Sequence, residues 1–281
     1  MIAFSIIIPT CNRNDLLSIC LDLLAPGIQT STTGNIEVIV TDDSKDKKAQ
    51  NLIKEKYSWV RWIKGPERGP AANRNNGAAN ASGTWLIFID DDCLPQKNLL
   101  ASYYSAIGKN SNVNVFEGRI TVDRPKLSFN EESPINENGG YLWSCNFAIK
   151  KEIFFAVKGF DEGFPFPAME DVDFDYRLRK ADIEIVFVKE AVVVHPWRLQ
   201  KKIYRTTMNR FRSTQYFLKK YPELASKFNY MHNLRIAYKA LKGLFTKSLA
   251  YKFRGFGSRV IFIFLQIYFV FYKVFNPKVY Q

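Results

Sequence analysis

The sequence is poor in the residues that build disulfide frameworks and zinc clusters. It has four cysteines and two histidines in 281 residues, and no two cysteines form a CxxC pair. Disulfide scaffolds and structural zinc sites need these residues in closely spaced sets. We therefore expect reduced, isolated thiols, as in a cytosolic protein, and no zinc site. The thiols are those of Cys11, Cys20, Cys93 and Cys145.

The beginning of the chain lacks the features of a secretory signal peptide. The apolar run 2–9 is too short, and no basic segment precedes it. The composition, with 47% hydrophobic and 24% charged residues, is that of a globular protein. The length suffices for one large domain or two small ones.

Acidic residues are nearly absent from the last part of the chain. Residues 196–281 hold 18 Lys and Arg and one acid, Glu223, which gives a net charge of +17. Residues 1–195 hold 22 Lys and Arg and 26 acids, a net −4, and the two sums return the +13 of the whole chain. This asymmetry predicts an anionic partner for the basic region, either a membrane or a nucleic acid.

Strand-length apolar segments alternate with segments of helical periodicity over the first 200 residues. We expect strands at 2–9, 36–41, 60–63, 86–89, 113–122, 142–149, 183–188 and 191–194. We expect helices at 15–24 (capped by Asp15), 47–56, 71–81, 99–107, 151–157 and 171–181. Such alternation predicts an α/β domain with a mostly parallel sheet covered on both faces. We place this domain at 1–200, with a loop at 123–140, and a purely helical basic region at 201–281.

Three carboxylates, Asp90, Asp91 and Asp92, come directly after the predicted strand 86–89. Ligand sites of α/β sheets gather at the carboxyl ends of strands. Clustered carboxylates there favour a hard divalent cation, Mg²⁺ or Mn²⁺. The alternative is an acidic turn, and the triplet by itself leaves open which acid would bind a metal.

A second acidic strand end is Asp42-Asp43, which follows the strand 36–41. In a parallel sheet it would lie near Pro9 and Thr10 at the end of the first strand. A carboxylate there could accept the N–H of a pyrimidine base. An Asp-Ser turn is the simpler alternative.

Residues 65–77 combine glycine, proline and asparagine before a predicted helix. Helix N-termini attract phosphate, and Arg74, one turn into this helix, could add a planar cation. The segment is not a Walker A loop, because no Gly-Lys-Ser/Thr follows.

Acids also precede the predicted helix 171–181, after the segment Phe164–Pro167. Glu170 or Asp171, in a partly desolvated position, could act as a general base. Acids in a first helical turn are otherwise ordinary dipole partners. His195 follows the last predicted strand, where it is either structural or a ligand.

These pieces, in this order, resemble family 2 glycosyltransferases with the GT-A fold. The segments that carry the resemblance, spread over residues 4–198, are Ser5–Thr10 with Asn12-Arg13, Thr41–Ser44, Gly69 to Gly77 with Arg74-Asn75, Asp90–Asp92 as the DxD motif, and Gly159–Glu162 followed by Glu170-Asp171 and Arg177. The last 80 residues resemble no family.

The resemblance implies transfer of a sugar from a nucleotide-diphosphate sugar, with inversion, to a saccharide or lipid-linked saccharide, as in bacterial surface-polysaccharide assembly. The implied cofactor is Mn²⁺ or Mg²⁺, held by Asp92, Asp90 and His195. The implied base is Asp171, with Glu170 beside it. The nucleotide sugar is assigned to Pro9, Thr10, Asn12, Arg13, Asp42, Asp43, Arg74, Asn75, Asp90 and Asp91. The sugar and acceptor are assigned to Trp143, Asn146 and Glu170. Asp43 favours a UDP-linked donor.

The most apolar run in the chain is 260–272. Extended to 256–275 it reaches the roughly 20 residues that cross a bilayer, but it then includes Arg259 and Lys273. It can span the membrane, lie in the interface or be a core helix, and basic flanking residues favour anionic lipid. We expect a peripheral or monotopic protein on the cytoplasmic side of the membrane.

Two other functions compete with this hypothesis. A nucleic-acid-binding protein would use the +17 region to bind phosphate backbones, although the acidic cluster disfavours it. A nucleotidyltransferase would also use clustered carboxylates and a metal, but it would release pyrophosphate. The sequence gives no oligomeric state.

Overall fold

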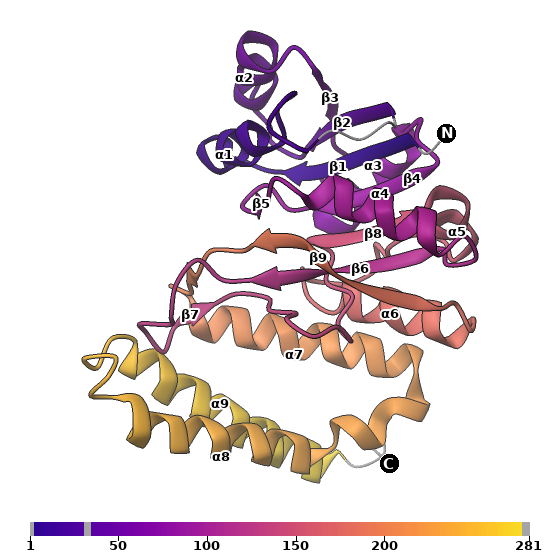
Figure 1. Ribbon diagram of the computed structural model, residues 1–281. Coiled ribbons are helices and arrows are strands. Elements are labelled where there is room, and N and C mark those ends of the chain that lie inside the picture. Colours follow the sequence, from indigo (N-terminus) through magenta and orange to yellow (C-terminus); the bar gives the residue numbers. More distant parts are fainter. Residues whose placement is uncertain (1–2, 31–34, 277–281) are drawn as a thin grey trace. The chain divides into compact units, whose positions relative to one another are not determined.

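The structure, a computed structural model, describes residues 3–30 and 35–276 (Figure 1). Residue 2, included in the first predicted strand, lies outside them. The chain forms two compact units. The first comprises residues 1–123, 134–163 and 170–196, and the second comprises 124–133, 164–169 and 197–281. The second unit thus also takes in two segments from the predicted catalytic region.

The first unit is built on one eight-stranded sheet in the order β3-β2-β1-β4-β8-β6-β9-β5. Its strands are β1 (Ala3–Thr10), β2 (Asn35–Asp42), β3 (Val60–Lys64), β4 (Trp85–Ile89), β5 (Leu94–Pro95), β6 (Val115–Thr121), β8 (Asn146–Lys150) and β9 (Ile185–Val194). β8 runs antiparallel to β4 and β6, and β5 runs antiparallel to β9. The other neighbours are parallel. The predicted mostly parallel α/β sheet is confirmed.

Helices cover both faces of this sheet because side chains alternate along each buried strand. Ile6 and Ile8 of β1 face α1 (Asn14–Leu24), α2 (Lys48–Lys56) and α4 (Leu99–Lys109). Ile7 faces the opposite side, which α3 (Pro70–Asn80), α5 (Lys151–Ala156) and α6 (Glu170–Lys180) cover. The small residues of α3 let it approach closely, since a Cβ at Gly77 would overlap Ile7.

Three predicted boundaries are wrong. The strand expected from residue 142 begins only at Asn146, because Trp143 and Asn146 donate their backbone N–H groups within a turn (2.8 and 3.2 Å). The strands expected at 183–188 and 191–194 are one strand, β9, whose register against β6 shifts beside Gly118. Asp15 does not cap α1, since the helix begins at Asn14 and Asp15 lies inside its first turn.

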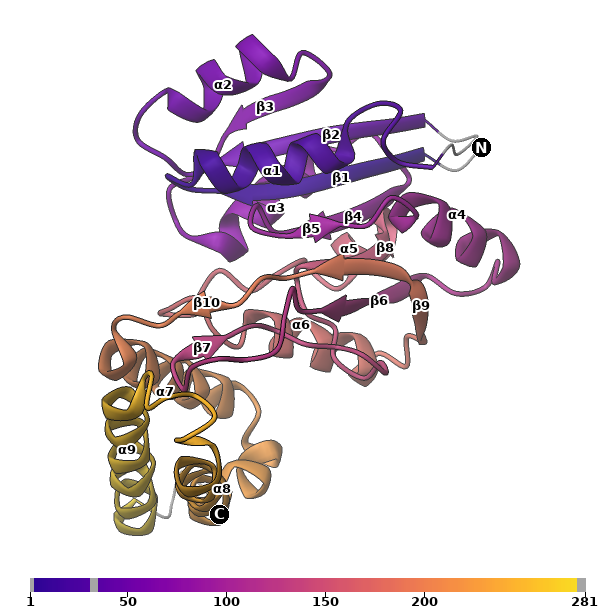
Figure 2. The ribbon, with the colours of Figure 1, turned by 60° about the vertical axis from the view of Figure 1, so that its left-hand side comes forward.

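Within the described part of the second unit, the regular elements are helices apart from the short pair β7 (Glu131–Glu132) and β10 (Arg198–Leu199). Its helices are α7 (Ile203–Lys220), η1 (Pro222–Phe228), α8 (Tyr230–Lys247) and α9 (Phe256–Phe275). α8 and α9 lie side by side (Figures 1 and 2). α7 packs on α9, with the rings of Phe211 and Phe269 stacked at 4.0 Å.

Candidate active site

The polar strand ends of the first unit meet at one edge of the sheet. β1 and β2 pair in parallel with Thr10 opposite Asp42, and the Asp43 N–H donates to the Thr10 carbonyl (2.9 Å). β4 lies on the other side of β1, so the Asp90–Asp92 segment leaves the sheet at the same edge. The predicted position of Asp42 and Asp43 near the end of the first strand is confirmed.

Asp91 is the structural member of the acidic triplet. It is fully buried, accepts a hydrogen bond from the Thr10 hydroxyl (2.7 Å) and pairs with Arg13 (2.6 Å). Burial raises the pKa of Asp91 to about 7, although Arg13 opposes this shift. Arg13 also pairs with Asp92 (3.1 Å). Thr10 and Arg13, assigned to the nucleotide, therefore organise the acidic cluster.

Asp92 lies beside His195, as predicted for a histidine at the end of the last strand. The Asp92 Oδ1 and His195 Nε2 atoms are 3.4 Å apart and both side chains are buried. The His195 backbone N–H donates to the Thr121 carbonyl (2.8 Å), which extends the β6–β9 pairing by one residue. His195 Nδ1 lies 3.1 Å from the Pro196 carbonyl. A proton on Nδ1 would donate there and turn the Nε2 lone pair toward Asp92.

The Asp92–His195 pair fits a divalent cation. Two adjacent ligands at 2.0–2.1 Å from an octahedral ion are about 3 Å apart, close to the observed separation. Cys93 is near, since one ligand atom from each of Asp92, Cys93 and His195 falls within 4.8 Å of the others. Burial raises the pKa of the Cys93 thiol well above its usual value, so this sulfur stays protonated and suits Mg²⁺ or Mn²⁺ poorly.

Arg74 connects the acidic triplet to helix α6. Its guanidinium pairs with Asp90 (2.6 Å), approaches Glu170 (3.7 Å) and lies over the Phe160 ring (5.6 Å). The Arg74 and Glu170 side chains are only 5% and 9% exposed. A buried cation between two carboxylates holds both of them in place. The sequence suggested instead that Arg74 would face a phosphate.

We expect replacement of Arg74 by methionine to lower the free energy of unfolding by about 3–5 kcal/mol, because the buried Glu170 and the partly buried Asp90 lose their shared cation. Urea denaturation followed by circular dichroism measures the change. Arg68→Met is the control. Its guanidinium also pairs with a glutamate, Glu162, but is 66% exposed, so we expect a loss of at most about 1 kcal/mol. Equal losses in the two variants would contradict the buried network.

Glu170 and Asp171 form the first turn of α6, where the prediction placed Glu170 before the helix. Glu170 is buried, and its Oε2 atom has no hydrogen-bond partner among the described residues. Asp171 is partly exposed. Burial and the adjacent Glu170 charge raise the pKa of Asp171 to about 7, with Arg74 opposing. The helix dipole predicted an easily ionised Asp171, and desolvation outweighs it.

Asp42 and Asp43 differ in their surroundings. Asp42 is fully buried and accepts hydrogen bonds from the Ser44 backbone (2.8 Å) and the Trp62 indole (3.3 Å). Asp43 is half-buried, and it accepts the backbone N–H groups of residues 67 and 69 (2.9 and 3.1 Å). Each carboxylate oxygen has a second lone pair. Asp43 thus retains the capacity to accept a base N–H, whereas the buried Asp42 carboxylate accepts hydrogen bonds from the protein itself.

Three further assigned residues make contacts inside the protein. Pro9 is buried inside β1 opposite Thr41. The Asn75 amide is used to hold the Phe160 backbone (2.8 and 2.9 Å). Asn146 is 1% exposed, accepts from the Tyr103 hydroxyl (2.8 Å) and donates to two backbone carbonyls (both 2.9 Å). These side chains stabilise the scaffold of the site.

Two assigned residues remain accessible. Asn12 is exposed in a left-handed conformation (φ 55°), and its N–H donates to the Ser44 hydroxyl (2.8 Å). Trp143 is partly buried, and its ring stacks on Tyr141 at 6.0 Å with an interplanar angle of 10°. Tyr141 is 60% exposed. Stacked aromatic rings at a strand end can contact the apolar face of a sugar.

Sequence reasoning missed Asn73 and the steric role of Gly65. Asn73 is buried and ties β1 to β2, since its amide donates to the carbonyls of Thr10 and Thr41 (3.2 and 2.8 Å). A Cβ at Gly65 would overlap Asp43 and Asn73, so only glycine lets the loop approach. The cluster of asparagines after a Gly-Pro loop was the available signal.

Known structures share this fold. GalNAc-T7 with UDP, GalNAc and Mn²⁺ superposes with a TM-score of 0.59 at 18% identity, over 76% of this chain and 48% of that one. Staphylococcus aureus TarS superposes with a TM-score of 0.53 at 19% identity, over 74% and 38%. The fold is therefore that of the GT-A glycosyltransferases.

The family follows from the sequence itself. The profile described as Glycosyl transferase family 2 matches residues 5–161, and the chain belongs to this family. An uncharacterized glycosyltransferase of Haemophilus influenzae is 26% identical over 89% of this chain and 88% of its own length. The GalNAc(5)-diNAcBac-PP-undecaprenol β-1,3-glucosyltransferase of Campylobacter jejuni is 30% identical over 57% and 55%. The protein is a glycosyltransferase, and its fold class and family agree with the predicted resemblance.

Proposed function

We propose that this glycosyltransferase transfers a sugar from a UDP-linked donor to a hydroxyl of a saccharide or lipid-linked saccharide, with inversion and with Mn²⁺ or Mg²⁺ as cofactor. One observation carries the proposal. The Asp92–His195 pair and the Asp90–Arg74–Glu170 chain lie at the same sheet edge, and Asp171 follows Glu170 directly.

The nucleotide end of the donor is assigned to the carboxyl ends of β1 and β2. Asp43 has lone pairs that can accept the N–H of uracil. The same carboxylate accepts backbone N–H groups of the loop 65–69 and so holds this loop beside it. A related fold, GalNAc-T7, is known with UDP and Mn²⁺. This structural similarity supports UDP as the nucleotide of the donor.

Asp92 and His195 would hold the cation, and a divalent cation bound there would neutralise the charge of the departing diphosphate. Arg13 keeps the Asp91–Asp92 carboxylates together without a metal. Arg74 holds Asp90 and Glu170 at fixed positions. The protein thereby prepares the acidic edge before the donor arrives, which limits reorganisation during the reaction.

Asp171 would take the proton of the acceptor hydroxyl. The hydroxyl oxygen forms a bond to the anomeric carbon as the bond from that carbon to the diphosphate oxygen breaks. A pKa of about 7 suits a base that works near neutral pH. Attack opposite the leaving group inverts the anomeric configuration. Trp143 and Tyr141 could orient the sugar by stacking.

A lipid-linked acceptor is suggested by the relatives. The Campylobacter relative carries an undecaprenol diphosphate saccharide in its name, and chondroitin synthase of Escherichia coli is 25% identical over 68% of this chain. We place this protein in polysaccharide or glycolipid assembly on the same grounds. Nucleotidyl transfer is less consistent with the family membership.

The donor is tested by incubating the protein and Mn²⁺ with a panel of UDP-, dTDP- and GDP-sugars, with and without short saccharide acceptors. We expect release of UDP that depends on metal and increases with acceptor. Thermal stabilisation by the same nucleotide gives an independent readout of binding. Release of pyrophosphate, or preference for a purine nucleotide, would contradict the proposal.

Membrane association is supported by helix α9, which buries polar side chains and exposes apolar ones. Among the described residues one helix, Phe256–Phe275, is long and apolar enough to cross a membrane by length and composition. Its polar side chains face inward. Gln266 accepts from Asn233 (2.7 Å), and Lys273 donates to the Phe228 carbonyl. Burial lowers the pKa of Lys273 to about 8.

Many apolar residues of α9 face outward, although Leu265 and Phe269 are buried. Phe264 is 67% and Phe271 is 56% exposed, while Gln266 is 5% exposed. A core helix would show the opposite distribution, and exposed apolar surface of this extent is typical of a lipid or protein contact. We propose that α9 lies in the interface of the cytoplasmic leaflet.

The double variant Phe264→Glu with Phe271→Glu is expected to release the protein from liposomes, because charged groups replace exposed apolar ones without entering the core. Co-sedimentation with zwitterionic vesicles measures binding. The control, Ile28→Glu with Phe155→Glu, adds the same charge at residues that are 50% and 45% exposed in the first unit. Release of both variants to the same degree would contradict the role of α9.

A further inference from the structure

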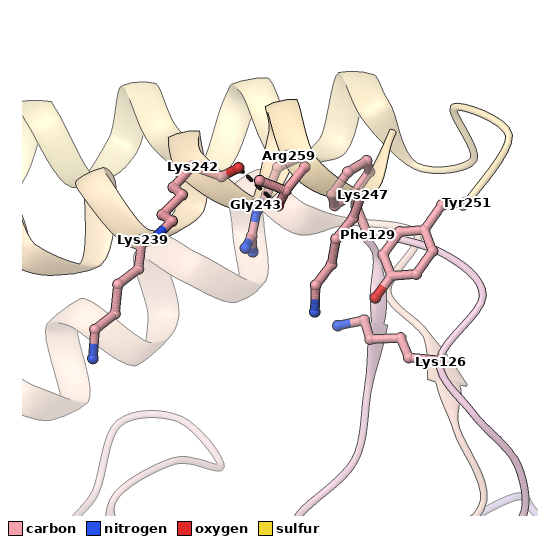
Figure 3. A pocket seen from close by; sticks show the side chains of 9 residues that line it. Lys126, Phe129, Lys239, Lys242, Gly243, Lys247, Tyr251 and Arg259 are labelled. Carbon is pink, nitrogen blue, oxygen red and sulfur yellow. Dashed lines mark hydrogen bonds between the residues drawn. The ribbon is translucent and has the colours of Figure 1, made fainter. Parts of the chain in front are cut away.

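The second unit contains a basic pocket of about 330 Å³. α8 supplies three lysines, α9 supplies Arg259, and the segment 124–133 supplies Lys126 and Phe129. The charged ends of Lys239, Lys247 and Arg259 lie on one side of the α8–α9 pair, and Lys126 faces them (Figure 3). Its full lining is Lys126, Phe129, Lys239, Lys242, Gly243, Thr246, Lys247, Tyr251 and Arg259.

The pocket has a strong excess of positive charge. None of its five cations forms an ion pair with a carboxylate within the part of the chain that the structure describes. Burial and the charges of Arg259 and Lys247 lower the pKa of Lys126, although the nearby Glu132 and Glu131 oppose this shift. Burial also lowers the pKa of Arg259. The electrostatic energy of clustered cations becomes favourable when an anion binds between them and neutralises their charge.

The fixed part of the pocket is its aromatic wall. Phe129 and Tyr251 are buried, and their rings meet edge to face at 4.9 Å. Arg259 is positioned between α8 and this wall, since its Nε donates to the Ala240 carbonyl (3.3 Å) and its guanidinium lies 5.8 Å from the Phe129 ring. The exposed lysines therefore lie around a buried aromatic wall.

The surface of helix α8 indicates what kind of anion fits the pocket. Its buried face, Ala237, Ala240 and Leu244, packs inside the unit. A second face is apolar but exposed, and its members are Leu234 (46%), Tyr238 (66%), Leu241 (43%), Phe245 (79%) and Leu249 (83%) just beyond the helix. At 3.6 residues per turn Lys239 lies about a third of a turn from the middle of this exposed apolar face, Lys242 about a sixth and Lys247 nearly half. An apolar face beside a cationic one matches the boundary between acyl chains and headgroups.

We propose that this pocket binds the phosphate headgroup of an anionic membrane lipid while the exposed apolar face of α8 enters the acyl boundary. The inference rests on the membrane association proposed above. Lysines act as point charges toward phosphate, and the Tyr251 hydroxyl can donate to its oxygens. The site is more specific than the diffuse attraction of a basic protein to a charged surface.

The test compares the full-length variants Lys239→Gln/Lys242→Gln/Lys247→Gln and Lys219→Gln/Lys227→Gln/Arg235→Gln. Both lose three exposed positive charges from the second unit, and only the first loses them from the pocket. Binding is measured with vesicles of phosphatidylcholine alone and with added phosphatidic acid. We expect the pocket variant to lose at least about tenfold more affinity for phosphatidic acid vesicles than the control variant.

Both variants should keep wild-type affinity for phosphatidylcholine vesicles and wild-type release of UDP, because neither changes the apolar faces or the catalytic unit. Equal losses in the two variants would overturn the pocket and leave only diffuse attraction. Tight binding of inorganic pyrophosphate without vesicles, lost in the pocket variant while vesicle binding is kept, would assign the site to a soluble anion. A wild-type protein that binds no vesicle would overturn the membrane association as well.

Discussion

Replacement of Asp92 by asparagine is expected to reduce Mn²⁺- or Mg²⁺-dependent turnover by about 10³-fold. The carboxylate faces His195 at 3.4 Å and is the acid best placed to bind the cation. Loss of a metal that stabilises the leaving diphosphate removes several kcal/mol of transition-state stabilisation, and each 1.36 kcal/mol is tenfold in rate. Steady-state UDP release and Mn²⁺ titration by calorimetry measure the two consequences.

Asp90→Asn is expected to have a smaller effect, since Asp90 is paired with Arg74. Asp46→Asn serves as the control, because it removes a carboxylate whose side chain is 44% exposed and whose partner is a surface lysine. The melting temperature of Asp92→Asn should stay near that of the wild type. Full activity of the wild type in EDTA, or unchanged Mn²⁺ affinity in Asp92→Asn, would show that the metal assignment is wrong.

Replacement of Asp171 by asparagine is expected to lower kcat by about 10²–10⁴-fold, the usual contribution of a general base. The donor should bind with nearly unchanged affinity, because its nucleotide end is assigned to other strand ends. A loss in kcat without a change in donor affinity identifies an interaction made in the transition state. Asp175→Asn is the matched control on the same helix, where the carboxylate pairs with Arg179 (3.0 Å).

The pH dependence gives a second readout of the same assignment. The pKa of Asp171 is raised to about 7, so the carboxyl is protonated and inactive as a base below that pH. Activity of the wild type should therefore rise with pH through about 7 and level off above it, and this step should be absent in Asp171→Asn. NMR of the anomeric proton should show inversion. Retention of configuration, or a near-wild-type Asp171→Asn, would refute the base.

The sequence by itself determined the fold class and the strand ends at which the candidate site is proposed. Strand-length apolar runs that end in carboxylates are local signals, because burial of a strand and exposure of its end are both visible in residue order. Thr10 pairs with Asp42 because both end parallel strands, and His195 approaches Asp92 because the two residues follow β9 and β4 of the same sheet. Residue order was therefore sufficient to predict that these strand ends lie close together.

The tertiary structure alone decided which polar side chains face a ligand and which serve the scaffold. Arg74 reaches Asp90 and Glu170 because α3 packs next to β1, and no spacing in the sequence encodes that contact. The Asn146 amide donates to two backbone carbonyls inside the sheet, and this contact also depends on packing rather than on spacing in the sequence.

The tertiary structure also decided the pKa of Asp171 and which side chains of α9 are exposed. A pKa depends on the burial and charge that packing brings together, so residue order alone could not show that desolvation of Asp171 outweighs the helix dipole. The sequence predicted an apolar helix at 256–275. Only its packing shows that Gln266 and Lys273 face inward while Phe264 and Phe271 face outward, because the buried face of a helix is set by its neighbours.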